Sequence, residues 1–197
     1  MNVLQVTPTN VYPPSDGGQH RSHGLVSALH GDGDAVYRYC QGGHLGNYRT
    51  GELKRKLDID DGYVEFQHLN PVFDLTRSPE LFGLPNVFLG SSLRLLRPTP
   101  LVERIGWADV ILVELPWQVP AVADLTDSSH NVEQERFETT ADGVGSAWFT
   151  SKVTAVERAA IERSAAVVCT SRRDAAEYGR RYDVDATTFV APNGISE

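Results

Sequence analysis

This sequence contains few lysines, few cysteines and no long hydrophobic run. Three lysines stand against 15 arginines, there are two cysteines, and the formal net charge is -8. The acidic balance argues against general nucleic-acid binding, which depends on cations that neutralise phosphates. No apolar run has the length of a membrane span, and the first residues lack the basic segment of a signal peptide.

The two cysteines, Cys40 and Cys169, lie far apart in expected strands, so we predict two reduced core thiols. No Cys/His spacing resembles a zinc site. The aspartate-rich, lysine-poor composition has two explanations. It suits a salt-loving host, where hydrated carboxylates keep a protein soluble, or it reflects a genomic bias toward arginine.

The 197 residues are 41% hydrophobic, which suffices for a substantial core. Strand-like runs alternate with helical patterns, which predicts an α/β fold: a single Rossmann-like domain with a mostly parallel sheet flanked by helices. Residues 70–99 contain four prolines and are expected to cross the surface with one helical stretch. We expect strands at 3–6, 35–39, 63–69, 109–114, 122–125, 165–169 and 188–191, and helices at 18–30, 152–163 and 172–182.

The loop after the first expected strand contains two prolines and the pair Gly17-Gly18, and a helical pattern follows at once. The carboxyl end of a parallel strand is a preferred ligand crevice, and a helix N-terminus favours anions such as phosphate. Glycines there let the backbone approach a ligand closely. The alternative interpretation is an ordinary surface loop before a helix.

Two further segments carry candidate binding residues. The run from Asp127 to Glu133 includes His130 and Asn131 and follows the strand expected at 122–125. Its polar side chains suit sugar hydroxyls, or else Asn131 simply caps a helix. Glu114 and Trp117 end another expected strand, where a carboxylate and an indole could meet a polyol, although Trp117 also fits an anchoring role in the core.

Basic residues gather in two places in this acidic chain, at Arg49 with 54–56 and at 93–97. They fit either an anionic membrane surface or a solvated face. His20 and His23 lie one helical turn apart, and we interpret them as surface histidines because no third metal ligand is visible.

Four segments carry a common pattern: the Pro-Pro-x-x-Gly-Gly loop with Arg21, His130-Asn131-Val132-Glu133, the run from Glu157 to Asp174, and Val190-Ala191-Pro192-Asn193-Gly194-Ile195. In their order and spacing, these segments resemble the amino-terminal lobe of a group 1 (family 4 type) glycosyltransferase of the GT-B architecture. Residues 70–99 carry no pattern of that family. The resemblance implies one Rossmann-like lobe at 1–191 and the start of an interdomain linker at 192–197.

The resemblance implies transfer of a sugar, of hexosyltransferase type, from a nucleotide-sugar to an acceptor hydroxyl with the anomeric configuration retained. The amino-terminal lobe would hold the acceptor, which is a glycan, a lipid or a small molecule. The second lobe would hold most of the donor nucleotide. No metal and no cofactor besides the donor are implied, because a helix terminus and basic side chains neutralise the diphosphate.

The resemblance also implies roles for individual residues. Gly17 and Gly18 would line the cleft near the donor diphosphate, and His130 would orient the transferring sugar without acting as a general base. Glu114 is our own prediction for an acceptor contact, made from the residues. The other predicted binding residues are Arg21, Asn131, Glu133 and Ser171, the last as a cap that faces the cleft.

The sequence ends at Glu197, before the second lobe that the resemblance implies, so we expect little transfer from this lobe alone. Two other functions stay open: a non-catalytic module that binds a glycan or a partner subunit, and a half-domain of a nucleotide-sugar epimerase. We expect a cytoplasmic location, either free or peripheral at the inner face of the membrane.

Overall fold

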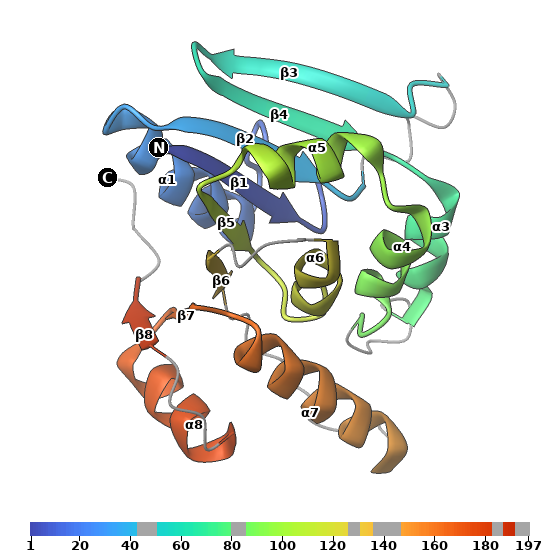
Figure 1. Ribbon diagram of the computed structural model, residues 1–197, viewed down its shortest axis with the longest axis vertical. Helices are drawn as coiled ribbons and strands as arrows, with labels where there is room; N and C mark the ends of the chain where they lie inside the picture. The colour runs from blue at the N-terminus through green and yellow to red at the C-terminus, as the bar shows by residue number, and fades with distance from the viewer. Residues whose placement is uncertain (43–50, 80–85, 126–130, 136–146, 183–186, 192–197) are drawn as a thin grey trace.

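The computed structural model describes residues 1–42, 51–79, 86–125, 131–135, 147–182 and 187–191, with the backbone alone at 131–135 and 147–150. These residues form an eight-stranded sheet in the order β3-β4-β2-β1-β5-β6-β7-β8 (Figure 1). Only β3 and β4 pair antiparallel, which confirms the predicted α/β fold with a mostly parallel sheet. The strands are β1 (Asn2–Thr7), β2 (Ala35–Cys40), β3 (Lys54–Asp60), β4 (Tyr63–His68), β5 (Val110–Val113), β6 (Asn131–Glu135), β7 (Ala166–Cys169) and β8 (Thr187–Val190).

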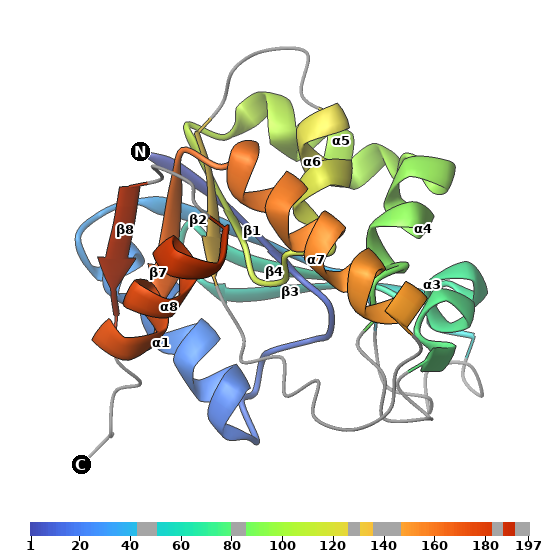
Figure 2. The ribbon, with the colours of Figure 1, turned by 90° about the horizontal axis from the view of Figure 1, so that it is seen from below.

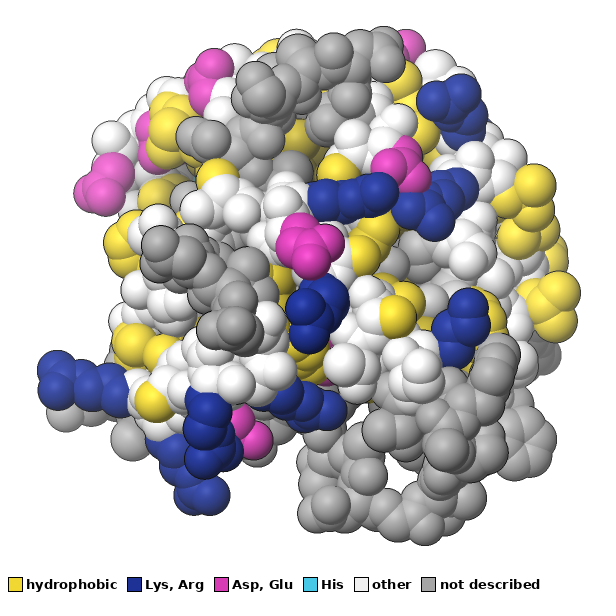
Figure 3. All heavy atoms as spheres, turned by 60° about the horizontal axis from the view of Figure 1, so that its bottom comes forward, with side chains coloured by type: hydrophobic (Ala, Val, Ile, Leu, Met, Phe, Trp, Pro, Cys, Tyr) yellow, Lys and Arg dark blue, Asp and Glu magenta, His cyan; other side chains and the backbone are white. Residues whose placement is uncertain are grey.

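Helices cover both faces of the sheet (Figure 2). On one face α1 packs on β1 and β2, while α5, α6 and part of α7 share a core with the opposite face of the same strands. Many arginine and lysine side chains gather on the face that carries α7 and α8 (Figure 3). The helices are α1 (Gly17–Gly31), α3 (Pro71–Thr76), α4 (Leu89–Leu96), α5 (Thr99–Trp107), α6 (Val119–Leu125), α7 (Ala147–Glu162) and α8 (Arg172–Tyr182).

The alternation of side chains in β1 explains this layering. Leu4 and Val6 point into the core shared with α5 and α6, whereas Val3 packs with Val26 of α1 on the other face. Successive side chains in a strand point to opposite faces, so a continuous apolar run buries both faces at once. Neither Cys40 nor Cys169 forms a disulfide and both are buried, which confirms the prediction of core thiols.

Two expectations about the elements were wrong. Residues 122–125 belong to helix α6, because a short apolar run buried on all sides has no periodicity that separates helix from strand. Residues 54–60, for which we predicted no element, form the edge strand β3, and the side chains of Lys54, Arg55 and Lys56 are exposed there, as expected of a solvated face. Residues 70–99 hold α3, α4 and the start of α5 instead of one helical stretch.

The helices of this region begin at local signals that the prolines obscured. The side chain of Asn70 accepts a hydrogen bond from the amide of Val72, and Pro71 occupies the first helical position of α3. Pro100 likewise stands in the first turn of α5. Proline is compatible with the first turn of a helix because the amide lost there has no partner within the helix.

His68 lies at the end of β4 among aromatic rings. Its Nδ1 is 2.8 Å from the hydroxyl of Tyr39, and its ring centroid is 5.3 Å from that of Phe73. Burial, followed by the charge of Lys54, lowers the pKa of His68 from 6.5 to about 4. A histidine with a lowered pKa in the folded state stabilises the fold above pH 6.5, and this contribution is lost as the pH falls towards 4.

We therefore expect His68→Gln, which cannot titrate but can still bind the Tyr39 hydroxyl, to be less sensitive to acid than the wild type. The difference should develop between pH 6.5 and about 4. Melting temperatures across this range measure it, with His20→Gln on the exposed side of α1 as the control. Parallel loss of stability in wild type and His68→Gln would contradict the role of His68.

Candidate functional site

The strand order places a switch point between β1 and β5. The chain leaves β1 for α1 on one face of the sheet and leaves β5 for α6 on the other, while Val6 and Val113 pair in register. At such a point the two connections diverge and leave a crevice beyond the carboxyl ends of the strands. The β1–α1 loop and the segment from Glu114 follow the carboxyl ends of β1 and β5 at this point.

Gly17 and Gly18 are the first two residues of α1, one position earlier than the helix start predicted from the sequence. Asp16 caps the helix, since its Oδ1 accepts a hydrogen bond of 2.9 Å from the amide of Gln19. A Cβ atom added to Gly17 would meet no other atom within 4 Å. The described fold therefore does not require a glycine at 17, and the space beside it is open to a ligand.

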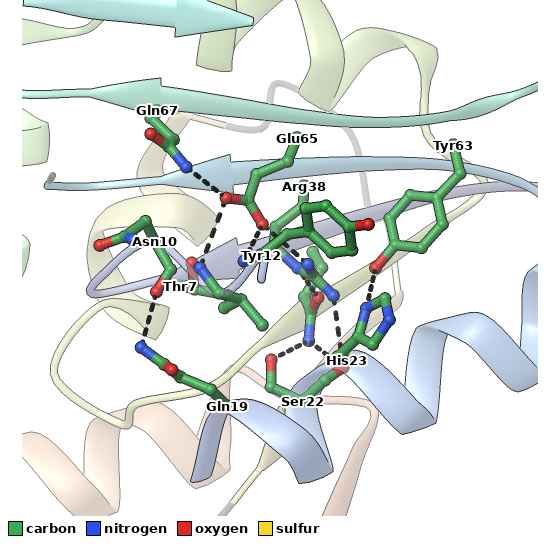
Figure 4. Close-up of polar contacts among 12 residues, drawn as sticks. Thr7, Asn10, Tyr12, Gln19, Ser22, His23, Arg38, Tyr63, Glu65 and Gln67 are labelled. Atoms are coloured by element: carbon green, nitrogen blue, oxygen red, sulfur yellow. Dashed lines mark hydrogen bonds and ion pairs between the residues drawn. The ribbon is translucent and has the colours of Figure 1, made fainter. Parts of the chain in front are cut away.

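The β1–α1 loop is held by a buried carboxylate from β4 (Figure 4). Glu65 accepts hydrogen bonds from the backbone amides of Val11 (3.4 Å) and Tyr12 (3.0 Å). It also accepts from Arg38 Nη1 at 2.8 Å and from Gln67 Nε2 at 2.7 Å. Four donors from three parts of the chain thus converge on Glu65, which anchors the loop to the sheet.

Glu65 belongs to a polar row that crosses three strands on the face beneath α1. Gln5 pairs with Arg38 and Arg38 with Glu65 in the strand register, and all three side chains are buried. Arg38 Nε donates to Gln5 Oε1 at 2.6 Å, and the Arg38–Glu65 ion pair is 0% exposed on both sides. The row is therefore a rigid, desolvated support under the first turns of α1.

Glu114 joins the same network from β5. Its Oε1 accepts hydrogen bonds from the hydroxyl of Ser22 on α1 and from Gln5 Nε2, and the residue is only 5% exposed. The structure thus brings Glu114 against α1, on the crevice side of β5. The predicted contact of Glu114 with an acceptor substrate stays a prediction. Its hydrogen bond with Ser22 joins α1 to the residue that follows β5. Trp117 is 4% exposed and packs with Val87, which favours the anchoring role.

His23 is half-buried beside the loop, unlike the exposed His20. Its ring centroid lies 5.5 Å from that of Tyr12 and 5.9 Å from that of Tyr63, and its Nδ1 is 3.1 Å from the Tyr63 hydroxyl. Burial, followed by the charge of Arg38, lowers the pKa of His23. The interpretation of a surface histidine therefore holds for His20 and is wrong for His23.

Arg21 lies on α1 one turn after Gly17 and is partly buried. Ser171 follows β7 at the same edge of the sheet and caps α8, as predicted. Its Oγ accepts a hydrogen bond of 3.1 Å from the amide of Asp174 and donates one of 2.7 Å to the Asp174 carboxylate. Two strands, β5 and β6, lie between β7 and β1 in the sheet.

The placement expected for Asn131 and Glu133 was wrong. Both lie within β6, where Asn131 pairs with Val110 and Glu133 with Leu112, so neither caps a helix nor follows a strand. The polar composition of β6 concealed a strand whose backbone pairs with β5 on one side and β7 on the other. His130 lies outside the described residues, as does the expected linker at 192–197. The binding roles of these residues remain predictions.

The sequence alone did not identify Gln5, Ser22, Arg38 or Glu65. A charged residue in the middle of an apolar strand, such as Arg38, was the available signal, because an isolated charge is not buried without a partner. Within the described part of the chain, no group of three or more histidine, cysteine, aspartate or glutamate residues is arranged to hold a metal ion. No described helix combines the length and the apolar character needed to cross a bilayer.

The two basic sets lie on different elements. Arg55 pairs with Glu52 at 3.8 Å, and Lys56 pairs with Asp58 of the same edge strand at 2.7 Å. Residues 93–97 lie in and just after α4, where Leu93 is buried. The described contacts do not join the two sets into one surface.

No family model and no curated protein matches this sequence significantly, but solved structures match the fold. Two are of sucrose-phosphate synthase from Thermosynechococcus elongatus. One is 13% identical with a TM-score of 0.58, and the match covers 100% of this chain and 91% of that chain. The other is 14% identical with a TM-score of 0.64 over 100% of this chain and 49% of that chain, so this chain spans about half its length. The likeness is one of fold, to these sucrose-phosphate synthase chains.

Proposed function

We propose that this chain is the acceptor-side, amino-terminal lobe of a retaining glycosyltransferase that uses a nucleotide-sugar donor. The observation that carries the proposal is the β1–β5 switch point, where the buried Glu65 holds the loop that leads into α1 and a Cβ atom at Gly17 would meet no described residue within 4 Å. The likeness to sucrose-phosphate synthase supports it at the level of the fold.

The chemistry follows from the start of α1. Its first amides have no partner within the helix, so they can donate to a phosphate oxygen, and the helix dipole favours that negative charge. Gly17 leaves room for the donor diphosphate or the transferring sugar to contact the backbone. The network that contains Arg38 and Glu65 keeps this terminus in place, so little reorganisation accompanies binding.

In this proposal His130, with Asn131 and Glu133 near it, orients the sugar. The leaving phosphate takes the proton of the incoming hydroxyl, so His130 has no role as a base. The acceptor is bound by this lobe, and most of the donor nucleotide by a second lobe. No metal is required, since the α1 terminus and basic side chains neutralise the diphosphate.

The test assays this chain alone and, where its reading frame continues past Glu197, the protein with that continuation, here called the joined protein. A panel of nucleotide-sugars is offered with and without glycan, lipid and small-molecule acceptors. We expect the joined protein to release nucleoside diphosphate only when an acceptor is present. Interconversion of the sugar without nucleotide release would instead indicate an epimerase. Glycan binding with no turnover of any donor would indicate a non-catalytic module.

The openness beside Gly17 allows a variant that separates binding from folding. We expect Gly17→Val to leave the melting temperature nearly unchanged, since a Cβ atom there meets no described residue within 4 Å, and to lower kcat/KM of the joined protein by about 10- to 100-fold by blocking the ligand. Steady-state kinetics and thermal melting measure the two effects.

Gly24→Val is the matched control, because Gly24 lies on the same helix and a Cβ there also meets no atom within 4 Å. It is exposed and lies about two turns from the crevice, so its kcat/KM should equal that of the wild type. Equal activity of the two variants would remove the start of α1 from the site.

A further inference from the structure

A second hollow lies between α4, α6 and α7, apart from the start of α1. It encloses about 310 Å³, which is near the lower end of ligand-pocket sizes. Apolar side chains line it, among them Phe88, Trp117 and Val156, and Phe88 is 39% exposed although it is a large hydrophobic residue. Figure 3 shows hydrophobic side chains surrounded by arginine and lysine side chains on the face that carries α7.

Small side chains on all three helices create this hollow. On α4, a Cβ atom added to Gly90 would overlap the carbonyl oxygen of Trp117, so α4 packs directly against the segment that leads into α6. On α7, the lining residues recur at helical spacing and form one stripe, in which Ala155 and Ala159 fill little space. The hollow is therefore built into the packing of the helices.

The polar part of the lining is basic. Arg94 Nη2 and Arg163 Nη1 lie 2.6 Å and 2.7 Å from opposite oxygens of Asp124, and Lys152 is a third cation of the lining. Each guanidinium carries five N–H donors, so the single carboxylate of Asp124 does not occupy all the donors of Arg94 and Arg163. Two guanidiniums thus share the carboxylate of Asp124 at the edge of the hollow, on a protein whose net charge is -8.

We propose that this pocket binds a small amphiphilic anion, an organic phosphate whose apolar body rests on Trp117 and Phe88. Its charged group lies among Arg94, Lys152 and Arg163. Arginine and lysine donate charge-assisted hydrogen bonds to phosphate, and the apolar floor adds affinity that a bare anion lacks. The proposal does not depend on sugar transfer by the other site.

The probe is 1-naphthyl phosphate, titrated by isothermal calorimetry without any nucleotide-sugar, with inorganic phosphate and neutral 1-naphthol as the comparison ligands. We expect binding of one molecule per chain, at least about tenfold tighter than either comparison ligand, and weaker as salt is added. Equal affinity for 1-naphthol would overturn the role of the cations. Equal affinity for inorganic phosphate would overturn the role of the apolar floor, and absence of binding would overturn the site.

Variants on α7 localise the binding. Lys152→Glu reverses one charge of the pocket and is expected to weaken binding at least about tenfold, and Ala155→Phe fills the hollow and should abolish binding. Both residues are exposed on the helix, so the melting temperature should stay close to that of the wild type. Arg158→Glu is the matched control, because Arg158 is exposed on α7 outside the pocket. Equal affinities for Lys152→Glu and Arg158→Glu would refute the assignment.

Discussion

Replacing Glu65 by alanine is expected to lower the free energy of unfolding by about 3–5 kcal/mol, since it leaves the buried charge of Arg38 without its partner. The backbone amides of Val11 and Tyr12 lose their acceptor in the same variant. Unpaired buried donors add to the cost, because water cannot replace the carboxylate. Urea unfolding followed by circular dichroism measures this effect.

The control is the removal of both charges. Arg38→Met combined with Glu65→Leu should be more stable than Glu65→Ala, because it removes both members of the buried ion pair and leaves neither charge without the other. The loop would still lack its anchor, so sugar transfer by the joined protein should stay low in the double variant.

Glu103→Ala, at an exposed glutamate of α5, should unfold like the wild type. A Glu65→Ala protein as stable as Glu103→Ala would disprove the anchoring role.

His130→Ala in the joined protein is expected to lower kcat by about 100-fold or more, with a smaller change in KM. The proposed contact orients the transferring sugar, and the loss of one well-placed polar group typically costs this much in the transition state. Steady-state kinetics with the preferred donor measures the effect. His20→Ala serves as the control, since His20 is an exposed histidine of α1. Unchanged transfer would remove His130 from the site.

The fold was largely predictable because several strands are rich in apolar residues, and β5 and β7 are continuous apolar runs. Residues such as Val3 and Ile111 are buried in the sheet, and the sequence marked both runs as strands. The errors fall where local pattern is ambiguous. Helix α6 is too short and too evenly buried for its hydrophobic residues to show a helical period. Strand β3 is rich in charged residues because it is an edge strand, which pairs with β4 on one side and has no strand of the described residues on the other.

The candidate site was predictable in part. The start of α1 at Gly17 and the cap at Ser171 depend on residues that are adjacent in the chain, so sequence signals identified them. The buried polar row beneath α1 was not identified from the sequence. Gln5, Arg38 and Glu65 come from three different strands, and only the strand order and register bring these side chains together.

The sequence by itself determined much of the alternation of strands and helices, the core thiols and the helix cap at Ser171, because each depends on side-chain pattern over a few neighbouring residues. The tertiary structure decided which strands are neighbours, and hence that Glu65 meets Arg38 and holds the loop before Gly17. It also decided that three helices enclose a basic pocket. Pairing and packing depend on contacts between residues far apart in the chain, and a one-residue change of register would turn every side chain of a strand to the opposite face.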